Sequence, residues 1–135
     1  VGLAQGFGLT EPCAIGTTVA HDCHHMLVVG TSETDMAKVA NKLAAVGGGQ
    51  AVSRNGEIIG LVELPIAGLM SSEQAPVVAK KAASILEGFR VCGCRLNNPN
   101  MQLSLLALVV IPELRLSDLG LVDVNQFDFI PVLEQ

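Results

Sequence analysis

The five consecutive residues His21-Asp22-Cys23-His24-His25 are the part of the sequence best suited to chemistry, because they place every histidine of the chain beside a carboxylate and a thiol. A cysteine nucleophile needs a base and a group that orients the base, and Cys23, a histidine and Asp22 are residues of those types. Histidine and cysteine also bind zinc. Adjacent residues of a strand point to opposite faces, however, so these five converge on one point only across a very tight turn.

Two other interpretations of this segment are open. In the first, Asp22 accepts hydrogen bonds from the backbone N–H groups of a turn, while the histidines lie on the surface of the domain. In the second, the segment lies at the edge of an active site that another domain completes. Neither interpretation requires all five side chains to converge.

The remaining reactive side chains do not form the sets that catalysis or metal binding requires. The cysteines make one Cys-x-Cys and two isolated residues, which differs from the paired Cys-x-x-Cys sets of a structural zinc site. Isolated acidic residues have no partner at a spacing typical of a general acid and base. We therefore predict no metal site in this chain, reduced thiols that serve as small core residues, and solvated acids. The residues concerned are Cys13, Cys23, Cys92, Cys94, Glu63, Glu113 and Asp118.

The histidine-rich segment lies between two predicted strands. Residues 13–20 and 25–29 are largely apolar, whereas the residues between them are polar. If the two strands form a hairpin about a turn at Asp22-Cys23, His21 and His24 become neighbours across the strands.

The strongest helical pattern covers residues 31–46. Ser32 and Asp35 have the spacing of a capping box, and Gly47-Gly48-Gly49 ends the helix because glycine adopts the left-handed conformation at little cost. One face is apolar at helical spacing. It comprises Met36, Val39, Ala40, Leu43 and Ala44.

The rest of the chain predicts further strands and one more helix. Residues 50–54 and 57–64 flank Asn55-Gly56, which favours a type I′ hairpin turn. A second helix opens at Ser71-Ser72, residues 101–111 form a long apolar strand, and residues 114–116, 121–124 and 127–132 are short extended pieces. The buried stripe of the second helix is predicted to be Val78, Ala82, Ile85, Leu86 and Phe89. This order predicts an α+β fold with two layers, in which two main helices pack on a mixed, mostly antiparallel sheet.

The composition predicts a single domain over residues 1–135. Half of the 135 residues are hydrophobic, 16% are charged, and the net charge of −5 without a basic stripe argues against binding nucleic acid. No apolar run approaches the roughly 18 residues of a membrane span.

Aromatic residues make up only 3%, so we expect apolar surface that a partner or a second copy covers. The start at Val1 lacks a signal-peptide pattern, and we interpret the chain as a fragment of a longer, cytoplasmic protein.

Six ordered motifs of this chain resemble one known family. They are residues 19–25, Val28-Val29-Gly30, Gly47-Gly48-Gly49, residues 64–71, residues 111–114 and residues 120–124. Together they look like the C-terminal domain of the bacterial and archaeal adenine deaminases, which belong to the amidohydrolase superfamily. That family has the pattern Ala-His-Asp-Ser-His-Asn at the histidine cluster, whereas this chain has Cys23 and His25 in place of the serine and the asparagine. His21, Asp22 and His24 do match, and the resemblance makes only these three the candidate residues of an active-site edge.

The resemblance implies that the intact enzyme hydrolyses adenine to hypoxanthine and ammonia with a hydroxide activated by a divalent metal, Mn or Fe. The ligands of that metal belong to a (β/α)8 barrel of about 250 residues, for which this chain has no room. We therefore expect this chain to pack on the barrel domain of the same polypeptide, to bind no metal itself, and to be inactive alone. We also expect the intact enzyme to be a homo-oligomer. The rival hypothesis is a stand-alone ligand-binding or assembly module without catalysis.

Overall fold

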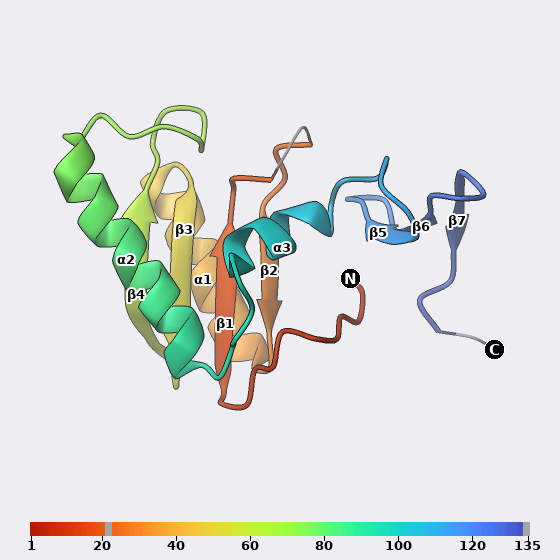
Figure 1. The fold of residues 1–135 in the computed structure, drawn as a ribbon, viewed down its shortest axis with the longest axis horizontal. Helices are drawn as coiled ribbons and strands as arrows, with labels where there is room; N and C mark the ends of the chain where they lie inside the picture. Colours follow the sequence, from red (N-terminus) through yellow and green to blue (C-terminus); the bar gives the residue numbers. More distant parts are fainter. Residues whose placement is uncertain (21–22, 134–135) are drawn as a thin grey trace.

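The centre of the fold is a four-stranded antiparallel sheet with the strand order β2-β1-β3-β4 (Figure 1). The computed structural model describes residues 1–20 and 23–133. The strands are β1 (Cys13–Thr17), β2 (Leu27–Gly30), β3 (Gly49–Arg54) and β4 (Glu57–Glu63). In the centre of the sheet, Ile15 of β1 lies opposite Val29 on one side and Val52 on the other. The predicted pairing of the first two strands is confirmed.

The first helix, α1 (Glu33–Val46), covers one face of this sheet. The Ser32 hydroxyl accepts a hydrogen bond from the backbone N–H of Asp35, as the capping pattern predicts. At the other end Gly47 adopts a left-handed conformation with φ 83°. Val39 and Leu43 are fully buried against Ala14 and Ala51 of the sheet, whereas Ala44, expected on the apolar face, is exposed.

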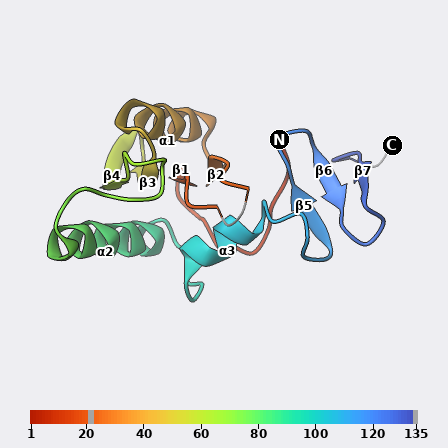
Figure 2. The same cartoon turned by 90° about the horizontal axis from the view of Figure 1, so that it is seen from above.

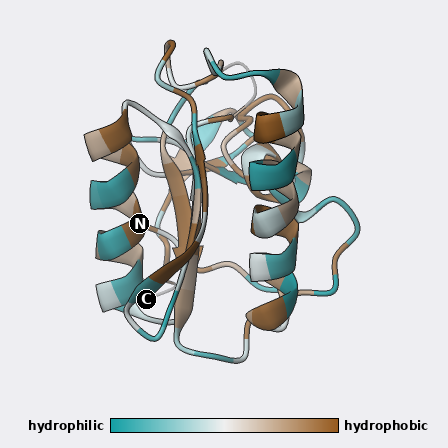
Figure 3. Cartoon of the chain, turned by 90° about the vertical axis from the view of Figure 1, so that its left-hand side faces the viewer, coloured by the Kyte–Doolittle hydropathy of each residue, from teal (hydrophilic) through white to brown (hydrophobic). Residues whose placement is uncertain are grey.

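The second helix, α2 (Ala75–Val91), and the short α3 (Pro99–Leu105) lie on the opposite face. Figure 2 shows α1 on one side of the strands and α2 and α3 on the other. Figure 3 shows a helix on each side of mainly hydrophobic strands. Ile85 and Phe89 of α2 and Leu103 of α3 pack against Ile15 and Val52. Successive residues of β1 and β3 therefore alternate between two helical layers.

The predicted hairpin about Asn55-Gly56 is confirmed. Asn55 and Gly56 have φ values of 51° and 79°, which are the positive angles that a type I′ turn requires at both central positions. The α+β class is also confirmed, with two main helices packed on a mostly antiparallel sheet. Within residues 1–20 and 23–133, no helix has the length and apolar character to span a membrane.

The prediction of a strand over residues 101–111 is wrong. Residues 99–105 form α3, and turns follow as far as residue 113. Pro99 lies in the first turn of the helix, where a proline costs no hydrogen bond, and Leu103 and Ala107 are buried at a spacing of four residues. A short apolar run does not distinguish a strand from a buried helix by its periodicity.

The start of the second helix is also corrected. The structure begins α2 at Ala75 instead of Ser71, because the Ser71 hydroxyl accepts a hydrogen bond from the backbone N–H of Glu73 and forms a local turn. Within the predicted buried stripe, Leu86 is exposed and Val78 and Ala82 are half-buried. This helix therefore buries a narrower face than its pattern predicts.

A second sheet of three short strands stands apart from the first. It comprises β5 (Leu114–Leu116), β6 (Leu121–Asp123) and β7 (Asp128–Ile130), which pair antiparallel in that order. The three predicted extended pieces are thereby confirmed. The N-terminus of the chain lies next to β5 in both views (Figures 1 and 2).

Candidate functional site

Thr18 follows the last residue of β1 and contacts two of the six motifs, the triple glycine and residues 64–71. Its backbone N–H donates to the carbonyl of Gly49 at 2.9 Å, and its hydroxyl accepts from the N–H of Gly49 at 2.8 Å. The same hydroxyl donates to the carbonyl of Gly68 at 2.6 Å. We call Thr18, Gly49 and Gly68 the Thr18 junction. It fixes the start of the segment that carries the histidines to the first residue of β3 and to the loop after β4.

The glycines at this junction allow the loops to approach closely. A Cβ atom added to Gly48 would lie 2.5 Å from the Cα of Gly68 and 2.9 Å from the Oγ1 of Thr18. Gly48 also has a φ of 112°, which side-chain-bearing residues rarely adopt. The triple glycine, interpreted from the sequence as the end of a helix, therefore also provides the contact surface for residues 64–71. The position of the triple glycine at the end of a helix does not predict this second role.

The loop after β4 presents an apolar tip at the same junction. Ile66 and Met70 pair across a turn in which Ala67 and Gly68 both have positive φ. The side chains of Ile66 and Met70 are exposed. The sequence predicts this loop only as a connector and as one of the six motifs of the family resemblance.

Of the candidate residues, His24 is described by the structure and is exposed. Its backbone has a φ of 52°, and its N–H donates to the carbonyl of Ala20 at 3.0 Å. His21 and Asp22 lie outside the described residues, so the pairing of His21 with His24 across the strands stays a prediction.

The next histidine borders a shallow hollow between the two sheets. His25, Met26 and Leu27 line one side of it, and Leu116, Ser117 and Asp118 line the other, around a volume of about 420 Å³. Asp118, which the sequence predicts to be solvated, is exposed but shares this hollow with His25. His25 therefore lies at the border between the four-stranded and the three-stranded sheet.

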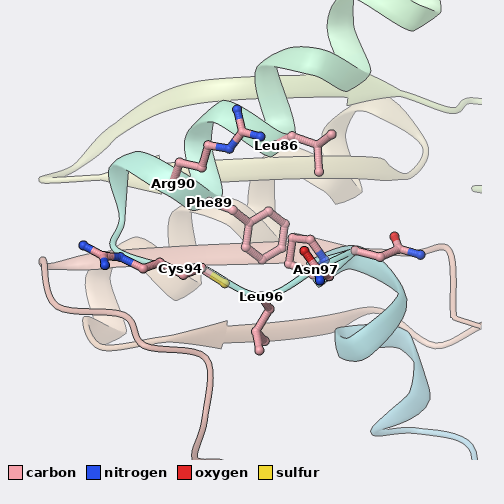
Figure 4. Close-up of a pocket in the computed structure, with 9 residues that line it drawn as sticks. Leu86, Phe89, Arg90, Cys94, Leu96 and Asn97 are labelled. Carbon is pink, nitrogen blue, oxygen red and sulfur yellow. The ribbon is translucent and has the colours of Figure 1, made fainter.

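A larger hollow lies elsewhere, at the C-terminal end of α2 (Figure 4). It has a volume of about 670 Å³, and Phe89 lies at its centre. Arg90 extends to one side of Phe89 and Leu96 to the other, so the labelled side chains do not converge on one point. Arg90 is also exposed and paired with Glu87 at 3.6 Å. The arrangement has the character of a surface groove.

The cysteines behave as core residues. Cys13, Cys92 and Cys94 are buried, Cys23 is half-buried, and all four are free. Burial, followed by the hydrogen bond with Cys13, raises the pKa of the Cys92 thiol to about 12. A neutral thiol is a poor nucleophile, so Cys92 has no catalytic character. Within the ranges that the structure describes, no three histidine, cysteine or acidic side chains are grouped to hold a metal ion.

Glu63, predicted to be solvated, is instead paired with α2. Lys81 donates to Glu63 at 2.6 Å and to Glu73 at 2.5 Å. The hydrogen bond from Lys81 lowers the pKa of Glu63, and the two carboxylates raise the pKa of Lys81. This network ties α2 to β4 and has a structural role.

Comparison with known proteins assigns the family. The model of the adenine deaminase C-terminal domain matches residues 1–128. This chain belongs to that family. It is 60% identical over 130 residues to the adenine deaminase of Roseobacter denitrificans and 57% identical over 129 residues to adenine deaminase 3 of Rhizobium meliloti. A more distant relative, the adenine deaminase of Moorella thermoacetica, is 44% identical over 133 residues.

The adenine deaminase C-terminal domain is a small part of each of these relatives. The matches cover 96–98% of this chain but only 22% of the length of each relative. The family resemblance drawn from the six motifs is confirmed over nearly the whole chain.

Proposed function

We propose that this chain is the C-terminal domain of an enzyme that hydrolyses adenine to hypoxanthine and ammonia. The observation that carries the proposal is the match of the adenine deaminase C-terminal domain to residues 1–128, together with relatives named adenine deaminase that cover 96% of the chain. The reaction adds the oxygen of water to C6 of the purine and releases the amino group as ammonia, which fits a role in purine salvage in the cytoplasm.

The reaction centre lies outside this chain in the proposed enzyme. A divalent metal, Mn or Fe, would lower the pKa of the attacking water in a barrel domain of the same polypeptide. This domain contributes by packing on the barrel and by lining the mouth of its active site. We propose that the intact enzyme is a homo-oligomer.

The residues proposed at the mouth are His21, Asp22 and His24. Asp22 accepts a hydrogen bond from an imidazole and thereby fixes its tautomer, while the other nitrogen of that ring faces the purine or the departing ammonia. Two features support this role. The segment starts from the Thr18 junction, where Thr18 is hydrogen-bonded to Gly49 and Gly68, and His24 is exposed at the surface of the domain.

The test of the proposed function is an assay of the full-length gene product. We expect release of ammonia and hypoxanthine from adenine, dependent on added Mn or Fe, and no release by residues 1–135 alone under the same conditions. Absence of adenine hydrolysis by the metal-loaded full-length protein would overturn the proposed activity. Metal-dependent hydrolysis by the isolated chain would overturn the assignment of the reaction centre to another domain.

A further inference from the structure

The three-stranded sheet is too small to bury its own apolar side chains. Each strand has three residues, and small sheets need an apolar face packed on another layer. The register places Leu116, Leu121 and Ile130 side by side on one face, where all three are half-buried. The N-terminal segment covers part of this face, because a Cβ atom on Gly2 would lie 2.5 Å from a methyl carbon of Leu116.

The rest of the sheet presents large apolar side chains to solvent. Phe129 lies opposite Val122 on the other face and is 54% exposed, and Phe127 in the preceding turn is 83% exposed. Leu119 and Leu133 are 78% and 69% exposed. Two of the four phenylalanines of the chain are therefore unburied within one short segment. We call Leu119, Phe127, Phe129 and Leu133 the C-terminal apolar surface.

We propose that the C-terminal apolar surface is the site where this domain docks on the preceding part of the same polypeptide. This inference rests on the proposed function only in taking the chain as one domain of a longer protein. The relatives have more than three quarters of their length outside the matched segment. Polypeptide that precedes Val1 would enter beside β5, since the N-terminal segment already lies along this sheet. The preceding domain is thereby held next to the three-stranded sheet at high effective concentration.

Charge favours this occupant over a second copy of the chain. Asp118 precedes Leu119 of this surface in the turn between β5 and β6, whereas Asp123 and Asp128 share the opposite face of the sheet with Leu121 and Ile130. Two copies of this surface would each contribute an Asp118 carboxylate, in a chain with a net charge of −5. We therefore expect the covering surface to be apolar, with a lysine or arginine residue near Asp118.

The test is hydroxyl-radical footprinting of the full-length protein, with oxidation of each side chain read by mass spectrometry. We expect Phe127 and Phe129 to react on the order of tenfold more slowly than in a peptide of the same sequence, as side chains in protected structure do. Met70, exposed at the apolar tip after β4, is an internal reference for an exposed side chain, and buried Phe7 is the reference for a protected phenylalanine.

Each outcome decides between occupants. Oxidation of both phenylalanines at the rate of the peptide would overturn the proposal, even in an enzyme that hydrolyses adenine. Protection that disappears on dilution to the monomer would assign the surface to a second copy and would also overturn it. Protection that persists in the monomer supports docking, and it does so whether or not the protein acts on adenine.

A pair of variants gives a second measurement. In the full-length protein, Phe129→Asp places a charge in the proposed interface, whereas Val77→Asp places one on the exposed side of α2. We expect Phe129→Asp to accelerate limited proteolysis at the start of this domain on the order of tenfold, because it weakens docking, and Val77→Asp to leave it unchanged. Equal proteolysis rates in both variants would contradict the inference. If Phe129→Asp does not fold, footprinting of the wild-type protein still decides.

Discussion

The carboxylate of Asp35 and the hydroxyl of Ser53 form a buried hydrogen bond that joins the first turn of α1 to β3. The same carboxylate accepts a hydrogen bond from the backbone N–H of Gly56 at 2.9 Å, within the hairpin turn. An acid in a capping pattern is expected to face the helix terminus. Asp35 instead links the helix to the hairpin that follows it.

Removal of this carboxylate is expected to destabilise the domain. Asp35→Ala leaves the Ser53 hydroxyl and the Gly56 N–H without their acceptor, which costs about 2 kcal/mol of the free energy of unfolding. Denaturation by urea, followed by circular dichroism, measures this change. Glu33→Ala is the matched control, because Glu33 lies in the same turn but is exposed, and we expect it to cost less than about 1 kcal/mol. Equal losses in the two variants would contradict a specific role for Asp35.

The same group predicts a pH dependence of stability. Burial alone would raise the pKa of Asp35, but the hydrogen bonds from Ser53 and Gly56 outweigh it and lower the pKa below the ordinary value of 3.8. A carboxyl with a depressed pKa in the folded state stabilises the fold above its unfolded pKa, and this contribution is lost as the pH falls through the folded pKa. We therefore expect the Tm of the wild type to fall below pH 4 more steeply than that of Asp35→Asn. Parallel Tm curves for the two proteins between pH 6 and pH 3 would show that other carboxyls dominate.

Substitutions at Thr18 test the junction that carries the histidine segment. Thr18→Val keeps the shape of the side chain but removes the hydroxyl that bonds Gly49 and Gly68, so we expect a loss of about 1–3 kcal/mol in stability. Thr18→Ser keeps the hydroxyl and is expected to retain most of the stability. Urea denaturation of both variants measures the difference. If Thr18→Ser is destabilised as much as Thr18→Val, the methyl group matters more than the hydrogen bonds.

Kinetics of the full-length enzyme test the proposed mouth residues. We expect His21→Ala and Asp22→Asn to lower kcat/KM for adenine on the order of 10- to 100-fold while the bound metal stays constant, as for residues that support a metal site without ligating it. Metal content by mass spectrometry and Tm are measured in the same samples. Wild-type kinetics in both variants would remove the segment from the active-site edge. Loss of metal together with activity would show that these residues are ligands.

Short sequence patterns predict α1 and the β3–β4 hairpin, because they fix the ends of these elements. Ser32, the triple glycine and Asn55-Gly56 fix the ends of α1 and the β3–β4 hairpin through backbone conformations that few other residues adopt. The strand prediction at 101–111 is wrong because Leu103 and Ala107 are buried through tertiary packing, which an apolar run does not encode.

The candidate site was predictable only in part. Its reactive residues stand out because polar groups interrupt an apolar hairpin. The contacts that support the site do not stand out in the sequence. Thr18 and Gly68 are 50 residues apart; Thr18 resembles an ordinary strand end, and Gly68 resembles an ordinary turn residue. Contacts between distant loops depend on the register of the sheet, which no local pattern specifies.

The strand order affects the sequence in which the strands pair as the domain folds. β1 is first in the sequence but lies inside the sheet, between β2 and β3. β1 and β2 are close in the sequence, so they can pair early. Pairing of β1 with β3 is complete only after the chain has been synthesised as far as Arg54. During synthesis, α1 and the β3–β4 hairpin have mostly local contacts and can form early, while β1 completes its pairing only when they are in place. We therefore expect the hydrogen bonds between β1 and β3 to be the last of this sheet to gain protection from hydrogen exchange, and the Thr18 junction to close with them.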